Sequence, residues 1–472
     1  MALIKSISGI RGTIGGNTKD NLTPVDIVKF TAAYGSWLLQ KNNNPTVIIG
    51  RDGRVSGEMV SNLVANTLIG LGFQVIDLGL STTPAVEMEV KYQIAAGGII
   101  ITASHNPKEW NALKLLNHNG EFINAEEGKL ILEIAEQENF NFATVDQLGT
   151  YIKDTTDSSL KNHIEAIADH KLVDITAIEK KNFKIIVDAI NSSGAIAVPA
   201  LLKALGVNDI QVLNEEMSGN FAHNPEPLPE NLTELSKAVL KNNADLGIAV
   251  DPDVDRLSFI CEDGSMFGEE YTLVAVADYV LSMKKGNTVS NLSSTKALQD
   301  ITVKHGGQYF SSAVGEVNVV AKMKEVNAVI GGEGNGGIIV PDLHYGRDAL
   351  IGIALFLTHL AKSGRSVKQL RSTYPDYFIS KNKIALPTGA GGKNGIDVKD
   401  IFEKLKDKYK NQPMNTEDGL KIEFDNDWVH LRTSNTEPII RIYAESNFET
   451  TADNIAKRLM QDIREMMTPS AP

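Results

Sequence analysis

The sequence predicts an α/β protein in which a strand–helix pattern starts three times and then changes character. Short apolar strands alternate with helices, the pattern restarts near residues 183 and 271, and strand-like segments dominate after about residue 370. A chain of 472 residues is long enough for about three or four domains. We expect boundaries near residues 153, 256 and 371.

The first unit has the βαβ pattern of a parallel or mixed sheet covered on both faces. Short apolar runs indicate buried strands, and longer segments with apolar residues three or four apart indicate helices. The expected elements are strand 47–50, helix 56–71, strand 75–78, helix 84–92 and strand 98–102.

The later units repeat this pattern before it changes. The second start is expected to contain strand 183–188, helix 195–205, strand 210–213, helix 230–242 and strand 244–250. The third start contains helix 271–283, strand 328–330 and the apolar helix 350–361. The last part is expected to form strands 382–386, 420–424, 428–431 and 439–443, and an amphipathic helix 451–467.

Composition excludes several classes of protein. The formal net charge of −13 argues against general nucleic-acid binding, which depends on clustered Lys and Arg. Cys261 is the only cysteine, so an intrachain disulfide and a site with several thiolates are both excluded. The N-terminus lacks the apolar core of a signal peptide, and the apolar run 349–360 is too short to span a bilayer. We therefore expect a soluble cytoplasmic protein without a membrane partner.

A first candidate loop, Thr102-Ala103-Ser104-His105-Asn106-Pro107, begins at the carboxyl end of the predicted strand, directly after residues 98–101. Ligand loops of open α/β sheets lie at the carboxyl ends of strands. Ser104 is a candidate nucleophile, and the alternative is that the polar residues only cap a turn. The G-x-S-x-G elbow of hydrolases is absent, which argues against acyl transfer.

A second candidate loop, Asp251-Pro252-Asp253-Val254-Asp255-Arg256, ends predicted strand 244–250. Carboxylates about 5 Å apart repel by roughly 3 kcal/mol at an effective dielectric near 20, so their convergence calls for a cation. Oxygen ligands in a short loop suit Mg²⁺. The alternatives are a solvated acidic turn, an EF-hand, whose sixth-position glycine is here Arg256, and a dehalogenase-type aspartate, whose D-x-D-x-[TV] continuation is missing.

A third candidate loop, Gly331-Gly332-Glu333-Gly334-Asn335-Gly336-Gly337, follows predicted strand 328–330. Its glycines let a ligand approach the backbone closely. Glu333 and Asn335 are its only functional side chains, and a carboxylate beside an amide suits sugar hydroxyls. The alternative is a wide turn or bulge.

A fourth candidate loop, Arg432-Thr433-Ser434-Asn435-Thr436-Glu437-Pro438, lies between two predicted strands and is followed by Arg441. Its guanidinium, hydroxyl and amide donors suit a phosphate dianion, and the alternative is a polar hairpin loop. Further cations that could balance anionic chemistry lie beside glycines or after the serine loop; they are Arg11, Arg51, Arg54 and Lys114. Each of them alone could equally be a surface residue.

In this order the four loops resemble those of the α-D-phosphohexomutase superfamily, which includes phosphoglucomutase, phosphomannomutase and phosphoglucosamine mutase. They are similar to its phosphoserine, magnesium, sugar-specificity and phosphate-binding loops, in chain order. Segments 9–12, 50–54 and 223–227 are also similar to family segments, so the likeness covers nearly the whole chain.

The resemblance implies a particular architecture. Three related α/β domains with mixed sheets covered by helices, and a smaller C-terminal α+β domain, would surround a central cleft. Residues 1–153 would carry the phosphoserine loop, 154–256 the metal-binding loop, 257–371 the sugar-binding loop and 372–472 the phosphate-binding loop. A linker near residue 371 would serve as a hinge.

The resemblance also implies a function. The chain would be an isomerase that interconverts hexose 6-phosphates and hexose 1-phosphates through a phosphoserine at Ser104 and a hexose 1,6-bisphosphate intermediate. One Mg²⁺ per chain would be bound, and the partner would be a small phosphosugar, with the chain acting as a monomer or homodimer. We expect phosphoglucosamine mutase, with phosphoglucomutase/phosphomannomutase as the alternative and a magnesium-dependent sugar-phosphate phosphatase as a more remote one.

The resemblance assigns roles to particular residues. The catalytic group would be Ser104, Lys114, Arg11, His105 and Arg256. The metal ligands would be Ser104, Asp251, Asp253 and Asp255. The substrate-binding group would be Glu333, Asn335, Arg432, Ser434, Asn435, Thr436 and Arg441. Lys114 is the expected proton-transfer group, a role that requires a lowered pKa.

Some positions depart from the family pattern. Asn335 stands where Ser is common, Gly337 where several members have His, and segment 314–317 has no His. His344, Arg347 and Asp348 follow the sugar loop and either line the cleft or support the fold. Rival functions of other classes are a phosphatase or kinase-like phosphotransferase, a sugar-phosphate sensor and a calcium-binding structural module.

Overall fold

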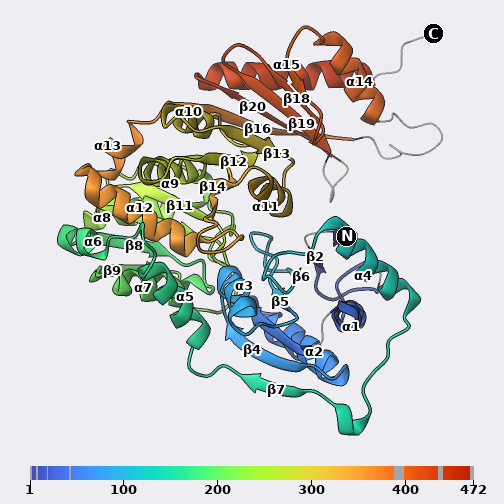
Figure 1. The fold of residues 1–472 in the computed structure, drawn as a ribbon. Helices are drawn as coiled ribbons and strands as arrows, with labels where there is room; N and C mark the ends of the chain where they lie inside the picture. The colour runs from blue at the N-terminus through green and yellow to red at the C-terminus, as the bar shows by residue number, and fades with distance from the viewer. Residues whose placement is uncertain are drawn as a thin grey trace, which may run out of the picture.

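The protein folds into four sheet-based units that follow one another along the chain (Figure 1). The computed structural model describes residues 3–6, 9–18, 20–41, 44–386, 398–433 and 439–467. The units form an arc from the N-terminal (blue) to the C-terminal (red) part of the chain. The predicted fold class is confirmed, because three α/β units with mixed sheets precede an antiparallel sheet.

The first unit contains a seven-stranded mixed sheet. Its strands, in spatial order, are β1 (Ile4–Ser6), β2 (Gly9–Thr13), β6 (Trp110–Leu116), β5 (Gly97–Ile101), β3 (Thr46–Arg51), β4 (Gln74–Leu80) and β7 (Thr150–Lys153). Its helices are α1 (Pro24–Lys41), α2 (Gly57–Gly70), α3 (Thr83–Tyr92), α4 (Ala125–Gln137) and the short η1 (Val145–Gln147).

Alternating side chains of β3 explain why helices cover both faces of this sheet. Val47 and Ile49 pack with α1, α2 and α4, whereas Ile48 packs with α3 on the opposite face. Both faces are thus removed from water, and each buried aliphatic side chain contributes about 1.5–3 kcal/mol.

The second unit has the strand order β11-β10-β8-β9. Its elements are α5 (Ser158–Ala168), α6 (Ile175–Lys181), β8 (Lys184–Asp188), α7 (Gly194–Ala204), β9 (Asp209–Leu213), η2 (Pro229–Asn231), α8 (Thr233–Asn242), β10 (Leu246–Val250) and β11 (Leu257–Cys261). β11 lies beyond the boundary expected at residue 256, yet it pairs with β10 along its whole length. The second sheet therefore continues to Cys261.

The third unit has the strand order β13-β12-β14-β15. Its elements are α9 (Glu269–Met283), β12 (Asn287–Asn291), α10 (Ala297–Lys304), β13 (Tyr309–Ser312), α11 (Glu316–Glu325), β14 (Ala328–Glu333), β15 (Gly337–Ile339), α12 (Ala349–Ser363) and α13 (Val367–Arg371). The glycine-rich segment expected to be a loop is a tight hairpin, because Gly331, Gly332 and Glu333 pair with β15. Only residues 334–336 form the turn.

The C-terminal unit is an antiparallel sheet of five strands ordered β16-β20-β19-β18-β17. Its elements are β16 (Phe378–Ala385), α14 (Val398–Lys408), β17 (Met414–Asn415), β18 (Leu420–Glu423), β19 (Trp428–Thr433), β20 (Ile439–Ser446) and α15 (Glu449–Met467). The core of this unit is separate from the others and lies between the sheet and the apolar faces of α14 and α15.

The second and third units share one continuous core. Helix α12 is buried along almost its whole length and packs against α9, α5, α6 and α7. Its first residue follows Asp348, so this rigid core also fixes the start of α12.

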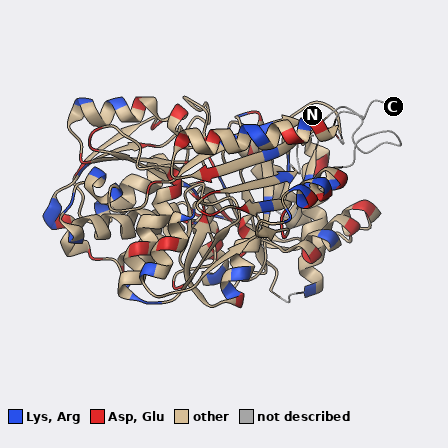
Figure 2. Ribbon diagram, turned by 90° about the horizontal axis from the view of Figure 1, so that it is seen from above, with Lys and Arg blue, Asp and Glu red and all other residues tan. Residues whose placement is uncertain are grey.

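Acidic and basic residues are interspersed over the elements (Figure 2). Within the described ranges, no helix is both long enough and apolar enough to cross a bilayer.

Candidate active site

The serine loop (102–107) lies between β5 and β6, and the Arg54 side chain binds its backbone carbonyls. The Arg54 guanidinium is almost fully buried, is 3.0 Å from the Asp52 carboxylate, and donates hydrogen bonds to the carbonyls of Asn106 (2.7 Å) and Pro107 (2.7 Å). Thr102 donates to the same Asp52 (2.7 Å) and accepts from the Ser104 N–H (2.9 Å). A planar guanidinium presents several donors in fixed directions, so Arg54 can hold the loop in one conformation.

Ser104 meets the aspartate loop of the second unit. Its hydroxyl donates to Asp251 Oδ2 over 2.7 Å and lies 3.3 Å from His105 Nδ1. The Ser104 backbone has a φ of 49°, and the side chain is 6% exposed. Left-handed backbone at a non-glycine residue is strained, and such strain concentrates at functional sites.

The three carboxylates of the aspartate loop (251–256) lie close together in the interior of the protein. Asp251, Asp253 and Asp255 are fully buried, and one oxygen from each lies within 4.8 Å of the others. Asp251 Oδ1 closes the loop by accepting from the N–H groups of Asp255 (3.1 Å) and Arg256 (3.0 Å). Val254, between them, has a φ of 61°, which is unusual for a β-branched residue.

The loop fits a divalent cation. Asp253 Oδ1 and Asp255 Oδ1 are buried and have no hydrogen-bond partner within the part of the chain that the structure describes. Burial, followed by repulsion from Asp253 and Asp255, raises the pKa of Asp251 well above its usual value. Two unpaired carboxylate oxygens next to a third carboxylate form the hard oxygen set that Mg²⁺ prefers, and a cation there would relieve the repulsion.

Lys114 lies against this loop, where its neighbours oppose the lowered pKa that a proton-transfer role requires. Its ammonium donates to Asp253 Oδ2 (2.7 Å) and Asp255 Oδ2 (3.4 Å). Burial works to lower the pKa of Lys114, yet the two carboxylates outweigh burial and raise it. With the protein's own charges, Lys114 is a fixed cation rather than a ready base.

Arg347 joins the aspartate loop (251–256) to the glycine-rich hairpin formed by β14 and β15, here called the sugar hairpin. Its guanidinium contacts Asp255 Oδ2 (2.6 Å), Glu333 Oε2 (2.7 Å) and Glu316 Oε2 (3.1 Å). Gly337 lets the side chain pass, because a Cβ there would lie 2.3 Å from Arg347 Cδ. Arg347 thus compensates three buried carboxylates from three segments.

Glu333 of the sugar hairpin is buried but ionised. Burial works to raise the pKa of Glu333, but Arg347 and Asn291 outweigh it and hold the pKa below its usual value. Asn291 donates to Glu333 Oε1 (2.8 Å), and Asn335 Nδ2 lies 3.5 Å from Oε2. The hairpin therefore offers an ionised acceptor beside a partly exposed amide.

Two other predicted residues lie at the serine and aspartate loops. Arg11 on β2 is 3.4 Å from the Asn106 side chain of the serine loop. Arg256 is anchored by Glu226 (3.0 Å), while its buried Nε has no hydrogen-bond partner among the residues described. Burial, together with Arg256 and Arg11, lowers the pKa of His105 well below its usual value, so His105 is neutral at pH 7.

The fourth predicted loop is only partly described. Arg432 and Arg441 are cross-strand partners on β19 and β20, and Lys383 on β16 pairs with Arg441 from the other side. Side chains directly opposite one another in a sheet share a face, so the three cations form one row. Ser434, Asn435 and Thr436 lie outside the described residues.

The prediction from sequence missed several residues that build the site. Thr83 donates to Asp253 Oδ2 over 2.6 Å, and Glu316, Glu226 and Asn291 hold site residues in place. Glu226 and Glu316 lie in segments 223–227 and 314–317, which the sequence analysis named without giving these residues a role. Thr83 and Asn291 lie in no motif, so no local signal could have found them. For Arg347 the sequence leaves two roles open, lining the cleft or supporting the fold, and its three ion pairs place it at the site.

Comparison with known proteins defines the class. Four family models match in chain order, describing phosphoglucomutase/phosphomannomutase α/β/α domain I (residues 3–142), domain II (161–264), domain III (268–377) and the C-terminal domain (392–463). The chain belongs to this family, within the α-D-phosphohexomutase superfamily, and it is a phosphohexomutase, an isomerase.

Particular relatives match over nearly their full length. A phosphoglucomutase/phosphomannomutase of Thermococcus kodakarensis is 37% identical over 93% of this chain and 95% of the relative. A phosphoglucosamine/phosphogalactosamine mutase of Sulfurisphaera tokodaii is 33% identical over 97% and 98%.

Solved structures share the fold. A Burkholderia thailandensis phosphoglucomutase/phosphomannomutase family protein has a TM-score of 0.84 at 24% identity, covering 100% of this chain and 99% of that one. An Aspergillus fumigatus N-acetylphosphoglucosamine mutase in complex with GlcNAc-6P and magnesium has a TM-score of 0.57 at 15% identity, covering 99% and 96%.

Proposed function

We propose that this phosphohexomutase moves phosphate between O1 and O6 of glucose and mannose through a phosphoserine at Ser104. The observation that carries the phosphoserine assignment is the 2.7 Å contact between the Ser104 hydroxyl and Asp251. It brings a nucleophile from one unit to the acidic loop of the next.

The phosphoryl group would pass between Ser104 and the substrate. The free hydroxyl oxygen of the substrate attacks phosphorus, and the bond from phosphorus to Ser104 Oγ breaks. Asp251, Asp253 and Asp255 would hold Mg²⁺, which supplies charge neutralisation for the phosphoryl oxygens when bound. Arg256 adds a second positive charge near the same oxygens, because its guanidinium is anchored by Glu226 and retains an unpaired Nε.

We assign proton transfer to His105 and charge balance to Lys114. The neutral imidazole of His105 lies 3.3 Å from Ser104 Oγ, within reach of the exchanging oxygens. Lys114 keeps its proton between Asp253 and Asp255. We therefore expect His105→Gln to alter the pH profile of kcat, and Lys114→Met to lower kcat without moving that profile.

The intermediate would be hexose 1,6-bisphosphate, which must turn end for end. Glu333 and Asn335 would bind sugar hydroxyls in both orientations. The row formed by Lys383, Arg432 and Arg441 would hold the phosphate that is not reacting, together with Ser434, Asn435 and Thr436. Arg11, beside Asn106, would attract the reacting phosphate.

The choice of sugar rests on the relatives. Thermococcus kodakarensis has one relative named phosphoglucomutase/phosphomannomutase, 37% identical, and another named probable phosphoglucosamine mutase, 31% identical. Within that organism, the chain is more similar to the protein whose name matches the proposal.

Glucosamine phosphate is the second candidate. The Sulfurisphaera tokodaii relative named for amino-sugar mutase activity is 33% identical, and the ionised Glu333 could pair with a substrate ammonium.

Substrate competition tests the choice. The kcat/KM should be highest with glucose 1-phosphate and mannose 1-phosphate and at least tenfold lower with glucosamine 6-phosphate, roughly the discrimination of one polar contact. A higher value with glucosamine 6-phosphate would select the second candidate. Glu333→Gln is the matched variant, because it should reduce amino-sugar turnover more than neutral-sugar turnover.

A further inference from the structure

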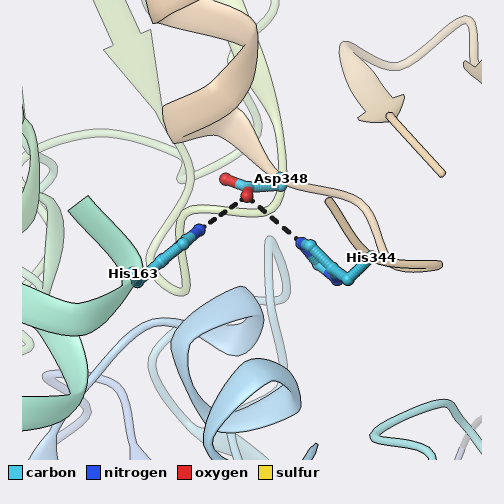
Figure 3. Close-up of side chains that lie close together, drawn as sticks. All are labelled: His163, His344 and Asp348. Atoms are coloured by element: carbon cyan, nitrogen blue, oxygen red, sulfur yellow. Dashed lines mark hydrogen bonds and ion pairs between the residues drawn. The ribbon is translucent and has the colours of Figure 1, made fainter. Parts of the chain in front are cut away.

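A buried cluster of two imidazoles and a carboxylate lies where the first three units meet (Figure 3). His163 is on α5, His344 is in the segment after β15, and Asp348 caps α12. Both rings point at one oxygen: His163 Nε2 is 2.8 Å and His344 Nε2 is 3.2 Å from Asp348 Oδ2. None of the three is more than 4% exposed, so bulk water does not compensate them.

The donor atoms have the spacing and chemistry of a transition-metal site. The two nitrogens and the oxygen lie within 4.8 Å of one another. Ligand atoms around a tetrahedral Zn²⁺ with bonds of about 2.0–2.1 Å are roughly 3.3 Å apart, close to the two separations from Asp348. Imidazole and carboxylate donors suit Zn²⁺, whereas Mg²⁺ prefers oxygen alone.

The surrounding groups orient these ligands. Asp348 Oδ1 accepts from the N–H groups of Leu350 (2.8 Å) and Ile351 (3.3 Å), which turns Oδ2 toward the two histidines. On the far side of the His344 ring, Nδ1 lies 3.3 Å from Glu87 Oε2 of α3. A carboxylate behind a ligating imidazole is the usual outer support of a zinc site.

Glu87 adds a second observation beside the cluster. It is 1% exposed, and its Oε2 faces His344 Nδ1, whereas Oε1 has no hydrogen-bond partner within the ranges the structure covers. A buried carboxylate behind an imidazole favours positive charge on that ring, and an ion bound to His344 Nε2 would supply it. A cavity of about 560 Å³ lined by α3, the end of α5 with the residues that follow it, and residues 342–343 borders the same elements.

We propose that His163 Nε2, His344 Nε2 and Asp348 Oδ2 bind a structural Zn²⁺, with Glu87 orienting His344 and a water molecule in the fourth position. The ion joins α3 of the first unit, α5 of the second and the start of α12. Arg347 directly precedes Asp348. The ion would therefore also fix the position of Arg347, which connects Asp255 with Glu333. This site is separate from the Asp251 loop and does not depend on the sugar.

Cobalt substitution in the full chain tests the proposal. Chelator-treated protein is titrated with Co²⁺ in excess Mg²⁺, in wild type and in Asp253→Asn, so that the Asp251 loop does not contribute. One equivalent should bind with the intense visible absorption of tetrahedral Co²⁺, and Zn²⁺ should displace it. His163→Ala should lose this band, and Glu87→Gln should bind about 10–100-fold more weakly.

The control is His305→Ala, which removes another histidine–aspartate contact, 2.7 Å long, outside the cluster and should leave the band unchanged. Absence of the band in wild type, or a band unaffected by both His163→Ala and Glu87→Gln, would overturn the proposal. Should His163→Ala not fold, anomalous diffraction at the zinc edge from wild-type crystals decides: a peak between the three side chains supports the site, and its absence refutes it.

Discussion

The Asp251 loop and the His163–His344–Asp348 cluster are both buried between units, but they balance charge in different ways. The first gathers three carboxylates from one loop and draws its cations, Lys114 and Arg347, from elsewhere. The second joins His163 of α5 to His344 and Asp348, which lie four residues apart before α12, and places two imidazoles around one carboxylate.

This difference has a chemical consequence. Fixed ammonium and guanidinium groups remain charged at all moderate pH values, so the Asp251 loop stays assembled while phosphate enters and leaves. Imidazole can exchange a proton for a metal ion, so the second cluster suits a resident ion rather than a reacting group. Disrupting the Asp251 loop should therefore reduce turnover, whereas disrupting the His163–His344–Asp348 cluster should reduce stability.

The largest expected effect is on turnover at Ser104. Ser104→Ala removes the only atom to which the phosphoryl group can return, so kcat should fall by roughly 10³-fold or more. Ser282→Ala is the control, because that hydroxyl only caps its own helix by donating to the Tyr279 carbonyl. Steady-state mutase assays measure both, and Ser104→Ala activity within tenfold of wild type would rule out the phosphoserine.

The next effect is on stability at Arg347. Arg347→Met leaves Asp255, Glu333 and Glu316 buried without their shared cation, and loss of a buried partner costs about 3–5 kcal/mol. Urea unfolding measures the change. Arg365→Met, at an exposed position, should stay within about 0.5 kcal/mol of wild type. A loss below 1 kcal/mol for Arg347→Met would show that Arg347 is not the link between the two loops.

A smaller effect separates the two clusters by metal. After chelation, Mg²⁺ alone should restore activity, whereas full thermal stability should return only when Zn²⁺ is added. At a free concentration about 100 times the Kd, bound Zn²⁺ should add about 2.7 kcal/mol to the free energy of unfolding. Calorimetry and activity are measured on the same samples. Complete recovery of thermal stability with Mg²⁺ alone would show that the His163–His344–Asp348 cluster does not require Zn²⁺.

The smallest effect is expected at Cys261, the last residue of β11, which belongs to neither cluster. Burial raises the pKa of the Cys261 thiol to about 11, so little thiolate forms in the folded protein between pH 7 and 9. A disulfide reagent should titrate no thiol over that range and one thiol after unfolding. Reaction of native protein at pH 8 would indicate that the core shared by the second and third units opens readily.

Site residues could be predicted from the sequence where one short segment carries all the chemically active side chains. Strand ends followed by Ser104 and by Asp251–Asp255 could be found because neighbouring residues supply the chemistry, and the structure brings both loops into contact. The glycine-rich segment predicts a loop, because glycine is depleted in strands, but Gly331 and Gly332 are held in β14 by pairing with β15.

Residues whose role depends on assembly could not be predicted in this way. His163 and Asp348 are 185 positions apart, and Thr83 reaches Asp253 across 170 positions. No spacing rule links such residues, because tertiary packing alone brings them together. The surroundings of Lys114 could not be predicted for the same reason, because the two carboxylates that raise its pKa come from another unit.

Intact-mass and peptide analysis of the protein after incubation with hexose 1,6-bisphosphate tests the central assignment most directly. We predict one added phosphoryl group, located on the peptide containing Ser104 and absent from Ser104→Ala. A stable phosphoryl group on any other residue, or none under conditions in which the protein turns over, would contradict the account.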